Sequence, residues 1–123
     1  CENELHTALE LNEFCMAYQP QINCVTGETV GFEALLRWTN KTLGPVAPDK
    51  FVSLLEETGM IYAVGKWVIK EVINFIRLGK TGNASIAVNL SALQCSDVYL
   101  ADFIGNEIKK SSIDPSFIEF EIF

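Results

Sequence analysis

Three oxygen-bearing side chains interrupt apolar stretches of this sequence. Glu33 lies within residues 32–38, Asn89 follows the apolar run 84–88, and Glu121 lies within residues 117–123. Two carboxylates and one amide are hard oxygen ligands of the kind that Mg²⁺ and Mn²⁺ prefer, whereas zinc more often recruits histidine or cysteine. If the fold brings these side chains together, they predict a cation site.

Glu33 also stands four residues before Arg37 in the run Glu-Ala-Leu-Leu-Arg-Trp. In an extended strand, side chains alternate between the two faces, so Glu33 and Arg37 share one face, and Leu36 and Trp38 lie on the other. One interpretation is a surface sheet with an exposed ion pair, because charged side chains are mostly exposed. The other is a site that combines a carboxylate with a guanidinium.

Apolar periodicity and turn residues predict the elements that would position these groups. Residues 29–38 and 14–22 read as a hairpin around Thr26-Gly27-Glu28, and residues 39–47 read as a loop. The other predicted elements are helices over 2–12, 48–58 and 60–78, a strand over 84–90, a helix capped by Ser96-Asp97 that runs to residue 110, and a strand over 117–123.

Strands that alternate with helices favour right-handed βαβ units and a parallel sheet, to which the first hairpin adds an antiparallel strand. In an α/β barrel, polar residues at the carboxyl ends of the strands converge on one face. Glu33, Asn89 and Glu121 are therefore expected to meet there. The 123 residues form one predicted domain, shorter than the roughly 250 residues of a complete barrel.

Composition excludes several classes of protein. The net charge of −7 disfavours binding to DNA, which needs clustered lysine and arginine. A hydrophobic content of 49% argues against disorder, and no apolar run approaches the ~20 residues that span a bilayer. The four cysteines lack zinc-site spacing and predict reduced thiols in a cytoplasmic domain, with a Cys15–Cys24 bridge as the open alternative.

Several motifs in order along the chain resemble the EAL domain, the bacterial phosphodiesterase domain that acts on cyclic di-GMP. They are Tyr18-Gln19-Pro20, Gly31 to Trp38, Pro48-x-x-Phe51, Glu56 to Ile61, Gly65-x-Trp67-Val68, Val88 to Ala92, and Glu119 to Ile122. The resemblance covers nearly the whole sequence.

This resemblance implies a modified TIM barrel with one antiparallel strand, and hydrolysis of cyclic di-GMP to pGpG with Mg²⁺ or Mn²⁺. It further implies that Glu33 is catalytic. The implied metal ligands are Glu33, Asn89 and Glu121, and the implied nucleotide contacts are Gln19, Leu36 and Arg37.

The family pattern continues with a Thr-Glu pair, an Asp-Asp-Phe-Gly strand end and a lysine strand, whereas this sequence has Phe123 at the threonine position. We therefore expect a single EAL-type domain over residues 1–123, truncated after the strand that carries Glu121 and inactive alone. The alternative is a degenerate EAL module that binds cyclic di-GMP or a protein as a regulator.

A partial barrel would leave open sheet edges and an apolar inner face. The sequence therefore predicts a homo-oligomer that buries the open interior or the edges. Trp38 and Trp67 are interpreted as core residues rather than as platforms for a guanine base.

Overall fold

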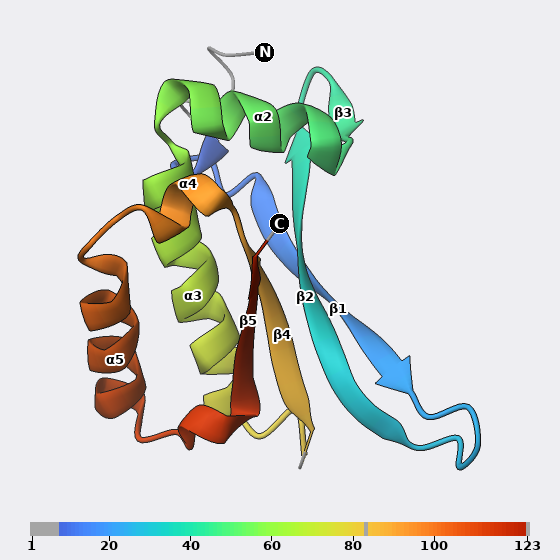
Figure 1. Cartoon of the computed structure of the whole chain (residues 1–123). Helices are drawn as coiled ribbons and strands as arrows, with labels where there is room; N and C mark the ends of the chain where they lie inside the picture. Colours follow the sequence, from blue (N-terminus) through green and yellow to red (C-terminus); the bar gives the residue numbers. More distant parts are fainter. Residues whose placement is uncertain (1–7, 83, 123) are drawn as a thin grey trace.

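The computed structural model describes residues 8–82 and 84–122, and its helices and strands follow the sequence predictions closely (Figure 1). The predicted helix over residues 2–12 falls largely outside the described residues. In order, the elements are β1 (Phe14–Ile22), β2 (Thr29–Asn40), β3 (Gly44–Val46), α2 (Pro48–Thr58), α3 (Ile61–Arg77), β4 (Ser85–Leu90), α4 (Ala92–Cys95), α5 (Leu100–Ser111), the 3₁₀ turn η1 (Pro115–Phe117) and β5 (Ile118–Ile122).

The strands form one five-stranded sheet in the order β1-β2-β4-β5, with β3 paired to the end of β2. β1 and β3 are antiparallel to β2, whereas β2, β4 and β5 are mutually parallel. The crossover from β2 to β4 runs through α2 and α3, and that from β4 to β5 runs through α5. The predicted α/β class with an incomplete sheet is confirmed. In addition to β1, the sheet contains a second antiparallel strand, β3, which pairs with β2.

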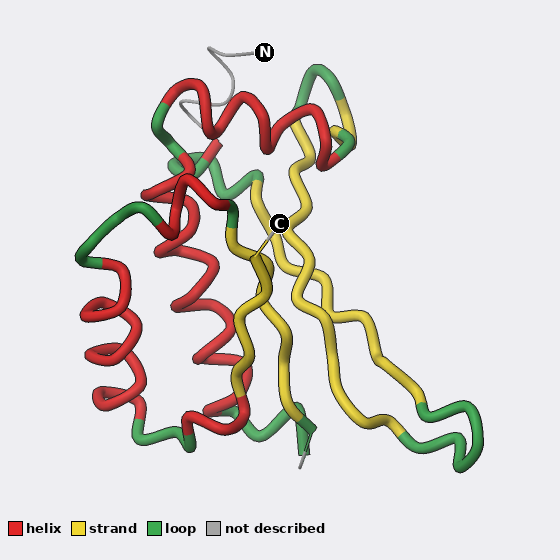
Figure 2. Tube along the Cα trace, in the orientation of Figure 1, coloured by secondary structure: helices red, strands yellow, loops and turns green. Residues whose placement is uncertain are grey.

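α3 and α5 lie on one face of the sheet, while α2 lies across the end where β2 and β4 terminate (Figures 1 and 2). One apolar cluster joins α3 to β4 and β5, and another joins α2 to β1 and β2. In the second cluster the rings of Phe14, Trp38 and Phe51 lie with centroids 6.0 to 6.2 Å apart. The interpretation of Trp38 as a core residue is confirmed, since it is fully buried.

Two sequence predictions about local structure were wrong. Part of the predicted loop is β3, because Gly44 adopts a φ of +71° and Asn40 Oδ1 accepts bonds from the N–H groups of Thr42 and Leu43, which closes a tight hairpin. The helix predicted to run from the Ser96-Asp97 cap to residue 110 is α5, and a short helix that was not predicted, α4, precedes it. Ser91 caps α4, and α5 begins only at Leu100.

The uncovered face of the sheet, expected to be an apolar barrel interior, carries several polar side chains. Alternation places Glu33 and Arg37 of β2, Asn89 of β4, and Glu119 and Glu121 of β5 on this face, which lies opposite α3 and α5. Among these five, only Glu33 and Asn89 are half-buried, and the other three are exposed. Polar side chains therefore stand on this face beside apolar ones such as Leu35 and Ala87.

The described part of the chain also tests the expectations for the cysteines and for membrane-spanning helices. Cys15, Cys24 and Cys95 are exposed free thiols, so the Cys15–Cys24 bridge is absent. In residues 8–82 and 84–122, none of the helices combines the length and apolar character that crossing a bilayer requires.

Tyr18 packs β1 against α3, and its raised pKa predicts a loss of stability at alkaline pH. Its ring stacks on Phe75 at 3.8 Å, and burial, assisted by the negative charge of Glu71, raises the pKa of its phenol to about 12. Because the folded-state pKa lies above the unfolded value of about 10, neutral Tyr18 contributes stability fully below pH 10. This contribution is lost as the pH rises towards 12.

Between pH 10 and 12 the free energy of unfolding should fall less in Tyr18→Phe than in the unsubstituted chain, because phenylalanine has no phenol to ionise. Urea denaturation at each pH measures this free energy. Phenol absorbance should show that Glu71→Gln lowers the pKa of Tyr18, because it removes the neighbouring charge. Equal pH slopes in the unsubstituted chain and in Tyr18→Phe would contradict this assignment.

Candidate functional site

Glu33, Asn89 and Glu121 lie on one face of three adjacent parallel strands, Asn89 and Glu121 near the carboxyl ends of β4 and β5, and Glu33 in the first half of β2 in register with Ala87. The Asn89 Nδ2 group donates a hydrogen bond to Glu33 Oε2 at 3.2 Å. Asn89 and Glu121 are register partners across β4 and β5, so their side chains leave the same face side by side. The sequence placed all three at one end of a parallel sheet, and the structure does bring them to one region of one face.

The β2–β4 ladder ends just before Asn89. Paired residues of β2 and β4 run from Gly31–Ser85 to Ala34–Val88. Asn89 therefore lies one residue beyond the last of these pairs, where its side chain bridges to β2. A Cβ on Gly31 would approach the Ser85 carbonyl oxygen and Gln21 Oε1 to 3.3 Å, so glycine favours the close pairing at the other end.

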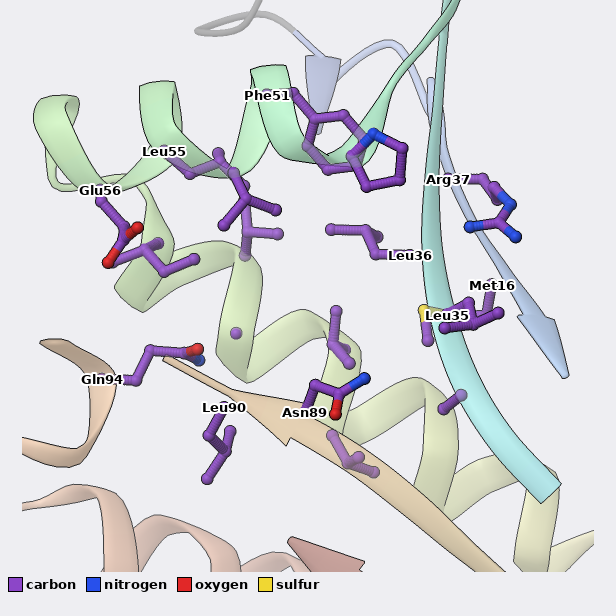
Figure 3. Close-up of a pocket in the computed structure, with 18 of the residues that line it drawn as sticks. Met16, Leu35, Leu36, Arg37, Phe51, Leu55, Glu56, Asn89, Leu90 and Gln94 are labelled. Atoms are coloured by element: carbon purple, nitrogen blue, oxygen red, sulfur yellow. The ribbon is translucent and has the colours of Figure 1, made fainter. Parts of the chain in front are cut away.

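The predicted nucleotide contacts lie on both sides of β2. Gln19 is the register partner of Glu33 and is exposed on the open face, and Arg37 is exposed on the same face, towards the end of β2. Leu36 lies on the opposite face, where it packs against the cluster beneath α2. Figure 3 shows Leu36 and Arg37 on opposite sides of the β2 ribbon, with Leu36 reaching into the cavity.

A cavity of about 580 Å³ lies between α2, α3 and the ends of β2 and β4. This volume falls within the range typical of pockets for small organic ligands. Its lining is mainly apolar, including Leu36, Phe51 and Leu90, and its polar residues include Arg37, Glu56, Asn89 and Gln94 (Figure 3). The cavity adjoins the open face through Arg37 and Asn89, so a ligand with an apolar ring and a charged group can span both.

The chemistry of the three predicted metal ligands fits a hard cation. Because Asn89 donates through Nδ2, its Oδ1 stays available to accept or to coordinate. Glu121 is exposed, and Glu119, the partner of Ala87 in the same register, adds a further carboxylate to this face. Among residues 8–82 and 84–122, histidine, cysteine and acidic residues do not gather in threes as a metal centre.

Sequence reasoning missed two buried polar residues near the site. Glu13 is 8% exposed, and its Oε1 accepts hydrogen bonds from Trp38 Nε1 at 3.1 Å and Asn40 Nδ2 at 3.2 Å. These bonds fix the end of β2 just after Arg37, and no pattern in the sequence distinguishes Glu13 from a surface carboxylate. The other residue, Gln94, completes a Ser-x-x-Gln capping box with Ser91, a signal that the sequence does contain.

Comparison with known proteins identifies the family. The EAL domain family model matches residues 2–123. The bifunctional diguanylate cyclase/cyclic di-GMP phosphodiesterase MucR of Pseudomonas aeruginosa is 37% identical over 98% of this chain and 18% of its own length. The cyclic di-GMP phosphodiesterase NbdA of the same organism is 31% identical over 98% of this chain and 15% of its own length.

Solved structures give the same result for the fold. The structure of the PaMucR phosphodiesterase in complex with c-di-GMP has a TM-score of 0.90 and 37% identity, and the match covers 96% of this chain and 49% of that one. The FimX EAL domain from Pseudomonas aeruginosa bound to c-di-GMP has a TM-score of 0.84 and 28% identity, with coverage of 98% and 48%. The chain thus spans less than a fifth of these curated relatives and about half of these solved chains.

Proposed function

Because the chain belongs to the EAL domain family, we propose that it supplies the β2–β4–β5 part of a cyclic di-GMP site in a phosphodiesterase domain that hydrolyses this nucleotide to pGpG. The observation that carries the proposal is the meeting of Glu33 and Asn89, hydrogen-bonded at 3.2 Å beside Glu121. The c-di-GMP complex of MucR, 37% identical to this chain, supports the choice of ligand.

The residue types on the open face suit the two phosphates of the nucleotide. The chain carries a net charge of −7, so an anionic ligand requires local positive charge. Arg37 can donate paired hydrogen bonds to phosphate oxygens, and Gln19 lies one strand away on the same face. Leu36 lines the cavity, where a guanine ring can pack against apolar side chains.

Glu33, Asn89 and Glu121 would hold Mg²⁺ or Mn²⁺ through their side-chain oxygens. The ion, when bound, supplies positive charge that offsets the phosphate and makes a water molecule more acidic. In hydrolysis the water oxygen adds to phosphorus, one phosphodiester P–O bond breaks, and the leaving ribose oxygen takes a proton. Glu33 and Asn89 contribute by holding their oxygens in a fixed relation through their mutual hydrogen bond.

We also propose that further protein completes the barrel along the edges of β1 and β5, each of which pairs on only one side within the described sheet. A second copy of the chain is one source of such strands, and the free thiols are in keeping with a cytoplasmic location. A mass of one chain, measured by light scattering at micromolar concentration, would contradict the proposal of a homo-oligomer.

Titration calorimetry of cyclic di-GMP into the chain with Ca²⁺ present tests the proposed site. We expect binding that Arg37→Ala weakens by about tenfold or more, the loss typical of one charged hydrogen bond. The matched control is Arg77→Ala, because Arg77 is exposed at the end of α3 and bonds to Asn74 Oδ1 on its own helix. No binding, or equal effects of the two substitutions, would overturn the proposed site.

A second function is in keeping with the FimX EAL domain from Pseudomonas aeruginosa, whose structure contains bound c-di-GMP. In this alternative the chain belongs to a module that binds the nucleotide as a signal. Product analysis with Mg²⁺ in place of Ca²⁺, in mixtures that also contain the protein that completes the barrel, separates the two functions. Formation of pGpG supports the hydrolase, whereas binding without product supports the sensor.

A further inference from the structure

Gly65 occupies a buried position inside α3, although glycine weakens helix interiors. A Cβ at this position would collide with Nε2 of Gln94 and would lie 3.2 Å from its Cδ. Gly105, inside α5, shows that this crowding is specific, since a Cβ there would meet nothing within 4 Å. The helical glycine at residue 65 therefore lets the Gln94 side chain lie directly against the backbone of α3.

Gln94 is held on its other side by the turn that follows β4. Its Oε1 accepts from the Ser91 backbone N–H at 2.9 Å, and its own N–H donates to Ser91 Oγ at 3.2 Å. Gln94 is 5% exposed and Ser91 is 1% exposed. Figure 3 shows Gln94 and Asn89 reaching towards the same cavity from α4 and β4. The amide of Gln94 thus fills the space between α3 and the turn that begins two residues after Asn89.

We infer that the contact between Gly65 and Gln94 positions Asn89 for its bond to Glu33. Asn89 lies one residue past the last register pair of β2 and β4, so its backbone is paired with β5 but not with the strand that carries Glu33. The Ser91–Gln94 box links the end of β4 to α4, and the contact with Gly65 sets how far α4 lies from α3. Gly65 and Gln94 are positioning residues, which act on the cation site through Asn89.

This inference rests on the proposed function only for its effect on ligand affinity, because the geometry of Asn89 can be read without any ligand. The side-chain amide signals of Asn89 in a ¹⁵N-resolved NMR spectrum report its hydrogen bond to Glu33. Affinity for Mn²⁺, measured separately, reports the cation site. A shift of the Asn89 signals in a chain that binds no Mn²⁺ would support the positioning role while contradicting the proposed function.

The test compares Gly65→Ala with Gly105→Ala, two identical substitutions inside helices. We expect Gly65→Ala to shift the Asn89 side-chain signals and to weaken Mn²⁺ binding by about tenfold or more, as is typical for the loss of a residue that orients a metal ligand. Gly105→Ala should leave both unchanged. Side-chain signals of Asn106, on α5, should stay in place in both variants, which separates repositioning of Asn89 from general loosening of the fold.

A second pair of variants keeps the inference testable if Gly65→Ala does not fold. Gln94→Ala removes the group with which the new Cβ collides, so adding Gly65→Ala to it should shift the Asn89 signals no further. Gln94→Ala alone should shift them relative to the unsubstituted chain. Unshifted Asn89 signals in Gln94→Ala, or an added shift when Gly65→Ala is combined with it, would overturn the inference.

Discussion

Glu33→Gln is expected to lower the affinity of the chain for Mn²⁺ by about 100-fold or more. Loss of a group that only orients a ligand costs roughly 10- to 100-fold in metal affinity, so loss of a ligand charge should cost at least the upper value. Glutamine keeps an oxygen that can accept the hydrogen bond from Asn89 Nδ2, so the local fold should survive. Calorimetric titration of MnCl₂ gives the two affinities.

Glu28→Gln is the matched control for this experiment. Glu28 is exposed in the turn between β1 and β2, and its backbone carbonyl accepts from the Asn23 N–H. We expect this variant to bind Mn²⁺ as the unsubstituted chain does, because Glu28 lies outside the proposed site. Both variants remove one negative charge, so the control separates the effect of position from that of total charge. If Glu28→Gln and Glu33→Gln weaken binding equally, the effect is one of total charge, and Glu33 is not a ligand.

Phe51→Ala is expected to have the largest effect on stability, a loss of about 3 to 5 kcal/mol in the free energy of unfolding. Phe51 has no exposed surface, and its ring contacts Phe14 and Trp38 edge-on, with centroids 6.2 and 6.0 Å away. These contacts hold α2 over the end of β2. Because the free energy of unfolding of a single domain is only about 5–15 kcal/mol, this loss is a large part of the total.

Urea denaturation followed by circular dichroism measures this loss. Val25→Ala serves as the control, because Val25 is 93% exposed and its truncation should change stability by no more than about 0.5 kcal/mol. A midpoint for Phe51→Ala within experimental error of that for Val25→Ala would mean that α2 does not depend on this aromatic cluster.

Sequence patterns were strongest where one periodicity dominated. The apolar spacing of residues 60–78 predicted α3 to within one residue at each end, and the turn at Gly27 predicted the hairpin of β1 and β2. Alternation also placed Glu33 and Arg37 on one face correctly. These features depend on neighbours in the sequence, which a single sequence displays.

Features that depend on contacts distant in the sequence were not predictable in the same way. The predicted start of α5 was three residues too early, and α4 was missed, because the Ser91–Gln94 capping box starts a short separate helix directly after β4. Glu13 is buried only because Trp38 and Asn40, about 25 residues later, supply its donors. The polar character of the uncovered face was present in the alternation of β5, but the total hydrophobic content of the chain concealed it.

We propose that Glu33, Asn89 and Glu121, on β2, β4 and β5, together hold a cation. Paramagnetic broadening by Mn²⁺, followed in ¹⁵N-resolved NMR spectra, tests it most directly, since broadening reports even weak binding at its location. The signals of Glu33, Asn89 and Glu121 should broaden first, while those of the distant turn at Gly27 stay sharp. Broadening centred elsewhere in the chain, or equal broadening of all exposed carboxylates, would contradict the claim.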